Sequence, residues 1–188
     1  LGPTADAHAP LPGTDGMASG LIQPILEPVQ GLLTATLGLV LARAPATIQP
    51  RAWGLYLIAL PAGALCAWGL GGGQVTLPAL GLVVLLGLGH AAQTTTSPAP
   101  ALAAALSTGL VAGLAALPDL SPQAEGLLPT TMGSLAGAAL MTLYLAGAAS
   151  WSLRQASRHM AFALAPRVLA AWAAAAAILL VAFEVRGR

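Results

Sequence analysis

The chain has 188 residues, of which only seven are basic and six are acidic, so charged residues make up 7% of it. Ordinary soluble domains carry about 25% charged residues. Hydrophobic residues make up 57% of this chain, and its mean hydropathy is +0.81. This composition excludes a soluble enzyme and a disordered chain, because too few polar groups exist to cover a surface exposed to water. All seven basic residues are scattered arginines, which excludes a nucleic-acid-binding patch.

The remaining class is an all-α integral membrane protein, because Ala, Leu and Gly dominate while aromatic residues are few. A membrane-spanning helix needs about 20 apolar residues. Six stretches meet this need, and in chain order they cover residues 20–42, 52–70, 75–92, 99–117, 127–151 and 162–183. Glycines at 71–73 and prolines at 118 and 122 mark breaks between them. We expect an external polar segment over residues 1–19 and a single six-helix transmembrane domain over residues 20–188.

The arginines indicate an orientation for these spans. Arg43 and Arg51 flank the first loop, and Arg154 and Arg158 lie in the fifth. Cytoplasmic loops are enriched in arginine, so both termini are expected on the external side, although two C-terminal arginines run against this rule. The first residues contain no hydrophobic signal core, so any signal peptide is expected to have been removed already.

The first span carries the polar residues of greatest interest. Gln23, Glu27 and Gln30 are spaced i, i+4 and i+7, which predicts that they share one helical face. Pro24 and Pro28 each remove a backbone N–H, and transporters often build ion sites where a helix is broken in this way. Two interpretations stay open: a polar pocket in the outer half of the bundle, or a helix start at the membrane surface where Glu27 reaches water.

Other polar side chains are scattered over the later spans. His90 is a possible lone ligand, although a single histidine near the membrane surface is more often solvated. Thr108, Thr142 and Tyr144 lie within spans, and the simpler expectation for such hydroxyls is a bond to their own helix. Cys66 is expected to pack as a small apolar residue. The sequence has no nucleophile–base pair, phosphate-binding loop or metal-ligand cluster, so we expect no enzyme, cofactor or bound metal.

Two spans carry glycines at the spacing that brings helices close together. Gly109 and Gly113 lie in the fourth span, and Gly133 and Gly137 lie in the fifth. Small residues four apart allow the backbones of membrane helices to approach each other. These faces are predicted to be close-packed, either within the bundle, for example against each other, or against a partner subunit.

Three segments carry a resemblance to a known family: QPILEPVQ at residues 23–30, TGLVAGLA at 108–115 and LYLAG at 143–147. In this order they resemble the His-Pro-x-x-Gly-x-Asp-His, His-Gly-x-x-His-Gly-x-Glu and Leu-His-Leu-Ala-Gly segments of the HupE/UreJ family. Its members are small six-span bacterial membrane proteins, linked to hydrogenase and urease gene clusters and regarded as nickel or cobalt permeases. The resemblance covers most of the chain, from about His8 to the sixth span.

The glycine frame of the family is present, whereas the likely metal ligands are replaced. The family's ligand positions hold Gln23, Val29, Gln30, Thr108, Ala112, Ala115 and Tyr144. Nickel and cobalt favour imidazole with carboxylate support, so the metal site is expected to be lost. Its vestige would be a polar pocket of Gln23, Glu27, Gln30, Thr108 and Tyr144.

The resemblance therefore implies a multi-pass protein of the bacterial inner membrane, in contact with lipids and other membrane protein subunits. Its expected role is that of a non-catalytic accessory subunit of a hydrogenase, respiratory or photosynthetic complex. The alternative is a divergent permease that uses Gln23, Glu27 and Gln30 for nickel, cobalt or a small polar solute.

Overall fold

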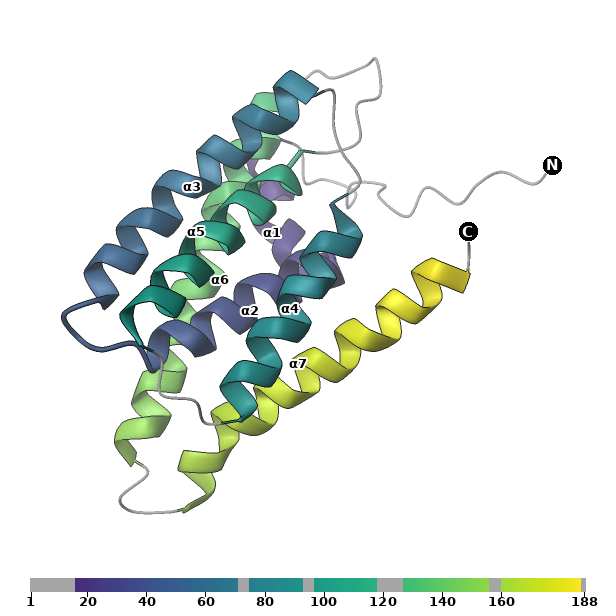
Figure 1. Ribbon diagram of the computed structural model, residues 1–188. Helices are drawn as coiled ribbons and strands as arrows, with labels where there is room; N and C mark the ends of the chain where they lie inside the picture. The colour runs from purple at the N-terminus through teal and green to yellow at the C-terminus, as the bar shows by residue number, and fades with distance from the viewer. Residues whose placement is uncertain (1–15, 71–74, 93–96, 118–126, 156–159, 187–188) are drawn as a thin grey trace.

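The computed structural model describes residues 16–70, 75–92, 97–117, 127–155 and 160–186, and these residues form seven α-helices and no strand. The helices are α1 (Met17–Leu26), α2 (Pro28–Ala42), α3 (Gln49–Leu70), α4 (Thr76–Ala91), α5 (Pro98–Leu114), α6 (Leu127–Gln155) and α7 (Met160–Arg186). The predicted all-α class is thus confirmed. Figure 1 shows one bundle in which successive helices from α2 onward run in opposite directions.

Three of the described helices, α3, α6 and α7, are long and apolar enough to cross a membrane. The pair α1 and α2 passes the same test when taken together, but the two helices are bent by 77° at their junction. The helices α4 and α5 are apolar but have only 16 and 17 residues, fewer than the roughly 20 of a typical span. The structure therefore supports a helical membrane bundle, while six crossings stay a prediction.

The later helices match the predicted stretches closely, because long apolar runs bounded by Pro, Gly or polar residues define helices well. Some ends differ: α3 begins at Gln49 and α6 continues to Gln155, beyond the apolar parts of their spans, whereas α5 ends at Leu114, before the predicted end at residue 117. A helix can continue into water past the membrane, so apolarity alone does not fix its ends. The helix α1 begins at Met17, inside the predicted polar segment, and the predicted glycine and proline breaks at 71–73, 118 and 122 lie outside the described residues.

The first span is broken rather than continuous. Glu27 is extended, with φ −92° and ψ 108°, and Pro28 opens α2. Residues before proline prefer this conformation, and proline is well suited to the first helical position. Because Pro28 has no N–H, the carbonyl of Pro24 has no donor four residues on. The prolines had indicated such an interruption, but the prediction that Gln23, Glu27 and Gln30 share one helical face was wrong, because the break separates Gln23 from Gln30.

The central helix of the bundle is α2, which is buried along most of its length. It contacts α4, α5, α6 and α7, and in Figure 1 it lies between the α3–α5–α6 group and the α4–α7 pair. The core around it is built from α2 residues such as Leu33, Leu37 and Leu41, together with Tyr56 and Leu80 of neighbouring helices.

The glycines of α5 pack against α3. A Cβ atom at Gly109 would lie 2.6 Å from the Cβ of Ala59, and one at Gly113 would overlap the carbonyl oxygen of Leu60. In return, a Cβ at Gly63 of α3 would overlap the carbonyl oxygen of Leu110. The two helices therefore approach each other at backbone distance, as small residues allow.

The glycines of α6 pack against α1. Added Cβ atoms at Gly133 and Gly137 would overlap the carbonyl oxygens of Met17 and Leu21, respectively. The two glycine faces thus pack within the bundle, as predicted. They do not pack against each other, which was one of the predicted arrangements. Each face instead contacts a helix that the sequence pattern did not single out.

Candidate polar site inside the bundle

The side chain of Gln30 is fully buried at the start of α2. Its Nε2 donates to the hydroxyl of Ser134 on α6 at 3.1 Å. Its Oε1 is also buried and has no hydrogen-bond partner among the described residues. Buried polar atoms are normally hydrogen-bonded, so Gln30 is the most unusual polar group of this region.

A hydroxyl cluster follows one turn further into the bundle and joins three helices. The hydroxyls of Tyr56 on α3 and Thr142 on α6 lie 3.0 Å apart. Thr142 Oγ1 is also 2.8 Å from the carbonyl oxygen of Ala138 and 3.4 Å from that of Thr34 on α2. The Thr34 hydroxyl in turn lies 2.9 Å from the carbonyl oxygen of Gln30. These contacts link α2, α3 and α6, and hydrogen bonds between helices stabilise membrane bundles.

Tyr56 is fully buried, although no pattern in the sequence pointed to it. A buried tyrosine usually finds a partner for its hydroxyl, and this rule alone could have indicated that Tyr56 makes an internal hydrogen bond. Its partner Thr142 is 86 residues away in the chain, so no local spacing could have connected the two.

Gln23 and Glu27 lie on the other side of the bend. Gln23 Nε2 and Glu27 Oε2 are 3.5 Å apart, and both side chains are partly buried. Gln30 instead points to Ser134. The structure thus brings two of the three first-span residues together and turns the third toward α6.

Two hydroxyls from the predicted pocket differ in their environment. Thr108 is fully buried, and its Oγ1 has no hydrogen-bond partner in the described part of the chain. Tyr144 is 76% exposed, so its assignment to an internal pocket was wrong. Residues two apart on a helix point about 200° apart. Because Thr142 faces inward, Tyr144 must face outward.

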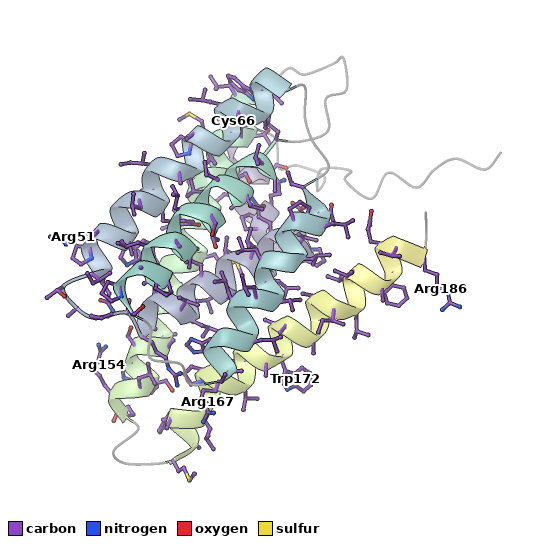
Figure 2. All side chains as sticks on the ribbon, viewed as in Figure 1. Arg51, Cys66, Arg154, Arg167, Trp172 and Arg186 are labelled. Carbon is purple, nitrogen blue, oxygen red and sulfur yellow. The ribbon has the colours of Figure 1, made fainter. Side chains whose placement is uncertain are left out.

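Two further predictions also need correction. His90 is only 5% exposed and is not solvated; it lies in the last turn of α4, a helix that packs against α2 and α7. Cys66 is exposed on α3 and does not pack inside the bundle. Figure 2 shows Cys66 on the outer side of that helix.

The described residues contain no group of three or more His, Cys, Asp or Glu side chains placed to hold a metal. The groups that meet around Gln30 and Thr142 are amides, hydroxyls, a thioether and backbone carbonyls. Such groups can bind each other, water or a small polar molecule, but they do not form an acid–base pair. No family model, curated protein or solved structure matches this chain. The HupE/UreJ resemblance therefore stays a prediction.

Proposed function

We propose that this chain is a six-crossing membrane protein of the HupE/UreJ type that has lost its metal site and serves as a non-catalytic subunit of a larger membrane complex. The observation that carries the proposal is where the side chains at the family's ligand positions lie in this structure. Gln30 bonds to Ser134, Ala112 is fully buried in the packed core, and Tyr144 points outward. These three positions contribute to packing or to the outer surface, and none of the family's ligand positions holds the imidazole that nickel or cobalt favours.

The six crossings of the proposal count α1 and α2 as one broken span and α4 and α5 as two short ones. The alternating helix directions in Figure 1 support this count. Figure 2 shows Arg51, Arg154 and Arg167 toward one end of the bundle and Arg186 at the other. By the rule that arginines gather on the cytoplasmic side, this supports both termini lying outside the bacterial inner membrane.

The helix α7 is the proposed contact with a partner subunit. Only 22% of the apolar stretch of α7 is buried against the rest of the chain, compared with 39% for the apolar stretches of α3 and α6. Trp172 and Phe183 are each 73% exposed on it, and Figure 2 shows Trp172 pointing away from the bundle. Large exposed aromatic residues are frequent anchors of protein interfaces.

The test is gentle detergent extraction of the tagged chain, followed by quantitative mass spectrometry of the membrane proteins that co-purify. We expect a stoichiometric partner that is lost in the variant Trp172→Ala/Phe183→Ala. The matched control is Ile58→Ala/Leu65→Ala, which truncates two exposed residues of α3 and should keep the partner. Purification of the chain alone, or equal loss of the partner in both variants, would contradict the proposed subunit contact.

A divergent permease is the second candidate, because the first span is bent by 77° at Glu27. Three residues further on, the Oε1 of Gln30 has no hydrogen-bond partner among the described residues. Broken helices often carry transport sites. Uptake of nickel and cobalt into vesicles containing the purified chain separates the two candidates. We expect no saturable uptake at micromolar metal, either by the natural chain or by Glu27→Ala. Saturable uptake that disappears in Glu27→Ala would favour the permease.

A further inference from the structure

Two arginines from distant parts of the chain bind the end of α4. Arg43, which follows α2, donates from Nη1 to the carbonyl oxygen of His90 at 3.3 Å. Arg167 of α7 donates from Nε and Nη2 to the carbonyl oxygen of Ala91 at 3.2 and 3.0 Å. The two guanidinium groups therefore bind neighbouring carbonyls of the same helix end.

Close packing of α4 and α7 sets this arrangement. A Cβ atom at Gly87 would lie 2.8 Å from the carbonyl oxygen of Ala170, so the two backbones approach each other directly. Gly87 is about one turn before Ala91, and Ala170 is about one turn after Arg167. The approach thus holds the Arg167 side chain below the last carbonyls of α4.

The cluster concentrates positive charge. Burial, and then the charge of Arg167, lower the pKa of Arg43, although an arginine side chain stays protonated in proteins. The C-terminus of α4 offers only about half a negative charge, which is less than the full positive charge of Arg43 alone. The described carboxylates, Glu27 and Glu184, lie at the far ends of α2 and α7, about 24 Å or more along those helices from the two arginines.

A buried polar group lies at the same place. The His90 side chain is 5% exposed, and its Nε2 has no hydrogen-bond partner among the described residues. Both guanidinium groups lie close enough to act on it electrostatically. Arg43 is half-buried and uses one of its five N–H donors in the bond to α4.

We infer that Arg43, Arg167 and His90 form a binding site for the phosphate group of an anionic phospholipid. Guanidinium groups bind phosphate through paired, charge-assisted hydrogen bonds. Basic sites between helix ends on the cytoplasmic side are suited to lipid headgroups. A lipid is favoured over a free phosphate because exposed apolar residues of both helices flank the arginines, among them Leu88 of α4 and Val168 and Leu169 of α7.

The site depends on the membrane placement of the chain but not on its proposed role as a subunit. The test uses the full chain purified in detergent, with native mass spectrometry of bound phosphatidylglycerol or phosphatidylcholine. We expect saturable binding of phosphatidylglycerol that weakens about tenfold or more in Arg43→Gln/Arg167→Gln, the loss expected for charge-assisted hydrogen bonds. The matched control, Arg51→Gln/Arg154→Gln, removes the same charge from exposed positions and should bind as the natural chain does.

Arg167 also supports the end of α4, so its replacement could weaken lipid binding by disturbing the fold. The single variant Arg43→Gln is therefore tested as well, by thermal unfolding with and without phosphatidylglycerol. A lipid site predicts that the stabilisation by lipid shrinks in Arg43→Gln, whereas a purely structural role would leave that stabilisation unchanged and would overturn the inference. Equal binding of both lipids would also overturn it, and so would competition by inorganic phosphate at millimolar concentration, which would assign the site to free phosphate. Release of the chain from membranes by alkaline carbonate would instead show that the membrane placement is wrong.

Discussion

Replacing Gly109 with alanine should push α5 away from α3. The new Cβ would lie 2.6 Å from the Cβ of Ala59 and 2.9 Å from the carbonyl oxygen of Tyr56, whereas ordinary contact begins at 3.4 Å. Neither neighbour is the end of a flexible side chain, so the helices must separate locally by about 0.8 Å. A gap of about 0.5–1 Å costs roughly a quarter to a half of the dispersion attraction at each affected contact.

Overpacking of this kind costs about 1–3 kcal/mol of the free energy of unfolding, or roughly 5 °C in the unfolding midpoint for a chain of this size. The measurement is thermal unfolding of the isolated chain in detergent, followed by circular dichroism. The matched control is Gly54→Ala on α3, where an added Cβ would meet no atom within 4 Å. This control should keep or raise the stability, by up to about 1 kcal/mol, because alanine favours helix more than glycine does.

Equal midpoints for Gly109→Ala and Gly54→Ala would refute the close packing of α3 and α5. A variant that is stable when isolated but lost from a complex would place the Gly109 face against a partner instead. The comparison is informative because both changes add the same methyl group to a helical glycine of the same pair of helices.

Three further predictions concern α1, α2 and the orientation of the chain. Gly137→Ala should lower the unfolding midpoint more than Gly147→Ala on the same helix, where an added Cβ has open space; equal effects would argue against the docking of α1. Gln30→Leu should lower the free energy of unfolding by about 0.6 kcal/mol, the average for a hydrogen bond between membrane helices, and a more stable variant would contradict this. Cysteines introduced at Ser121 and Ser157, which lie outside the described residues, should react with reagents from opposite sides of the membrane, Ser121 from outside. Equal labelling would refute the proposed orientation.

The positions of the helices could be predicted from the sequence, because long apolar runs leave few alternatives. The break in the first span could be predicted only in part. The prolines at 24 and 28 indicated an interruption, but Pro24 lies inside α1 while Pro28 begins a new helix. The direction of α2 after the bend depends on its contacts with distant helices, and these determine where Gln30 points.

The partners of the glycine faces could not be predicted for a similar reason. The spacing of Gly109 and Gly113 shows that a face of α5 is small, but not which helix fills it. The contact is with Tyr56, Ala59 and Leu60, about fifty residues earlier in the chain. Helices with equally apolar surfaces offer few local cues to their neighbours, since lipid and protein are similar environments for them.

The orientation of α6 about its own axis determines whether position 144 could contribute to a metal site inside the bundle. A Cβ at Gly38 of α2 would lie 3.0 Å from the carbonyl oxygen of Thr142, so α2 and α6 approach each other at this level. The approach places the Thr142 hydroxyl beside Tyr56 and the Thr34 carbonyl. Tyr144 then faces outward, because it lies about 200° further around the helix. A ligand at position 144 would reach the bundle interior only if α6 turned by about half a revolution, which would break the contacts that now join α2, α3 and α6. The proposed loss of a metal site therefore requires a different packing of α6 as well as the replacement of single ligands.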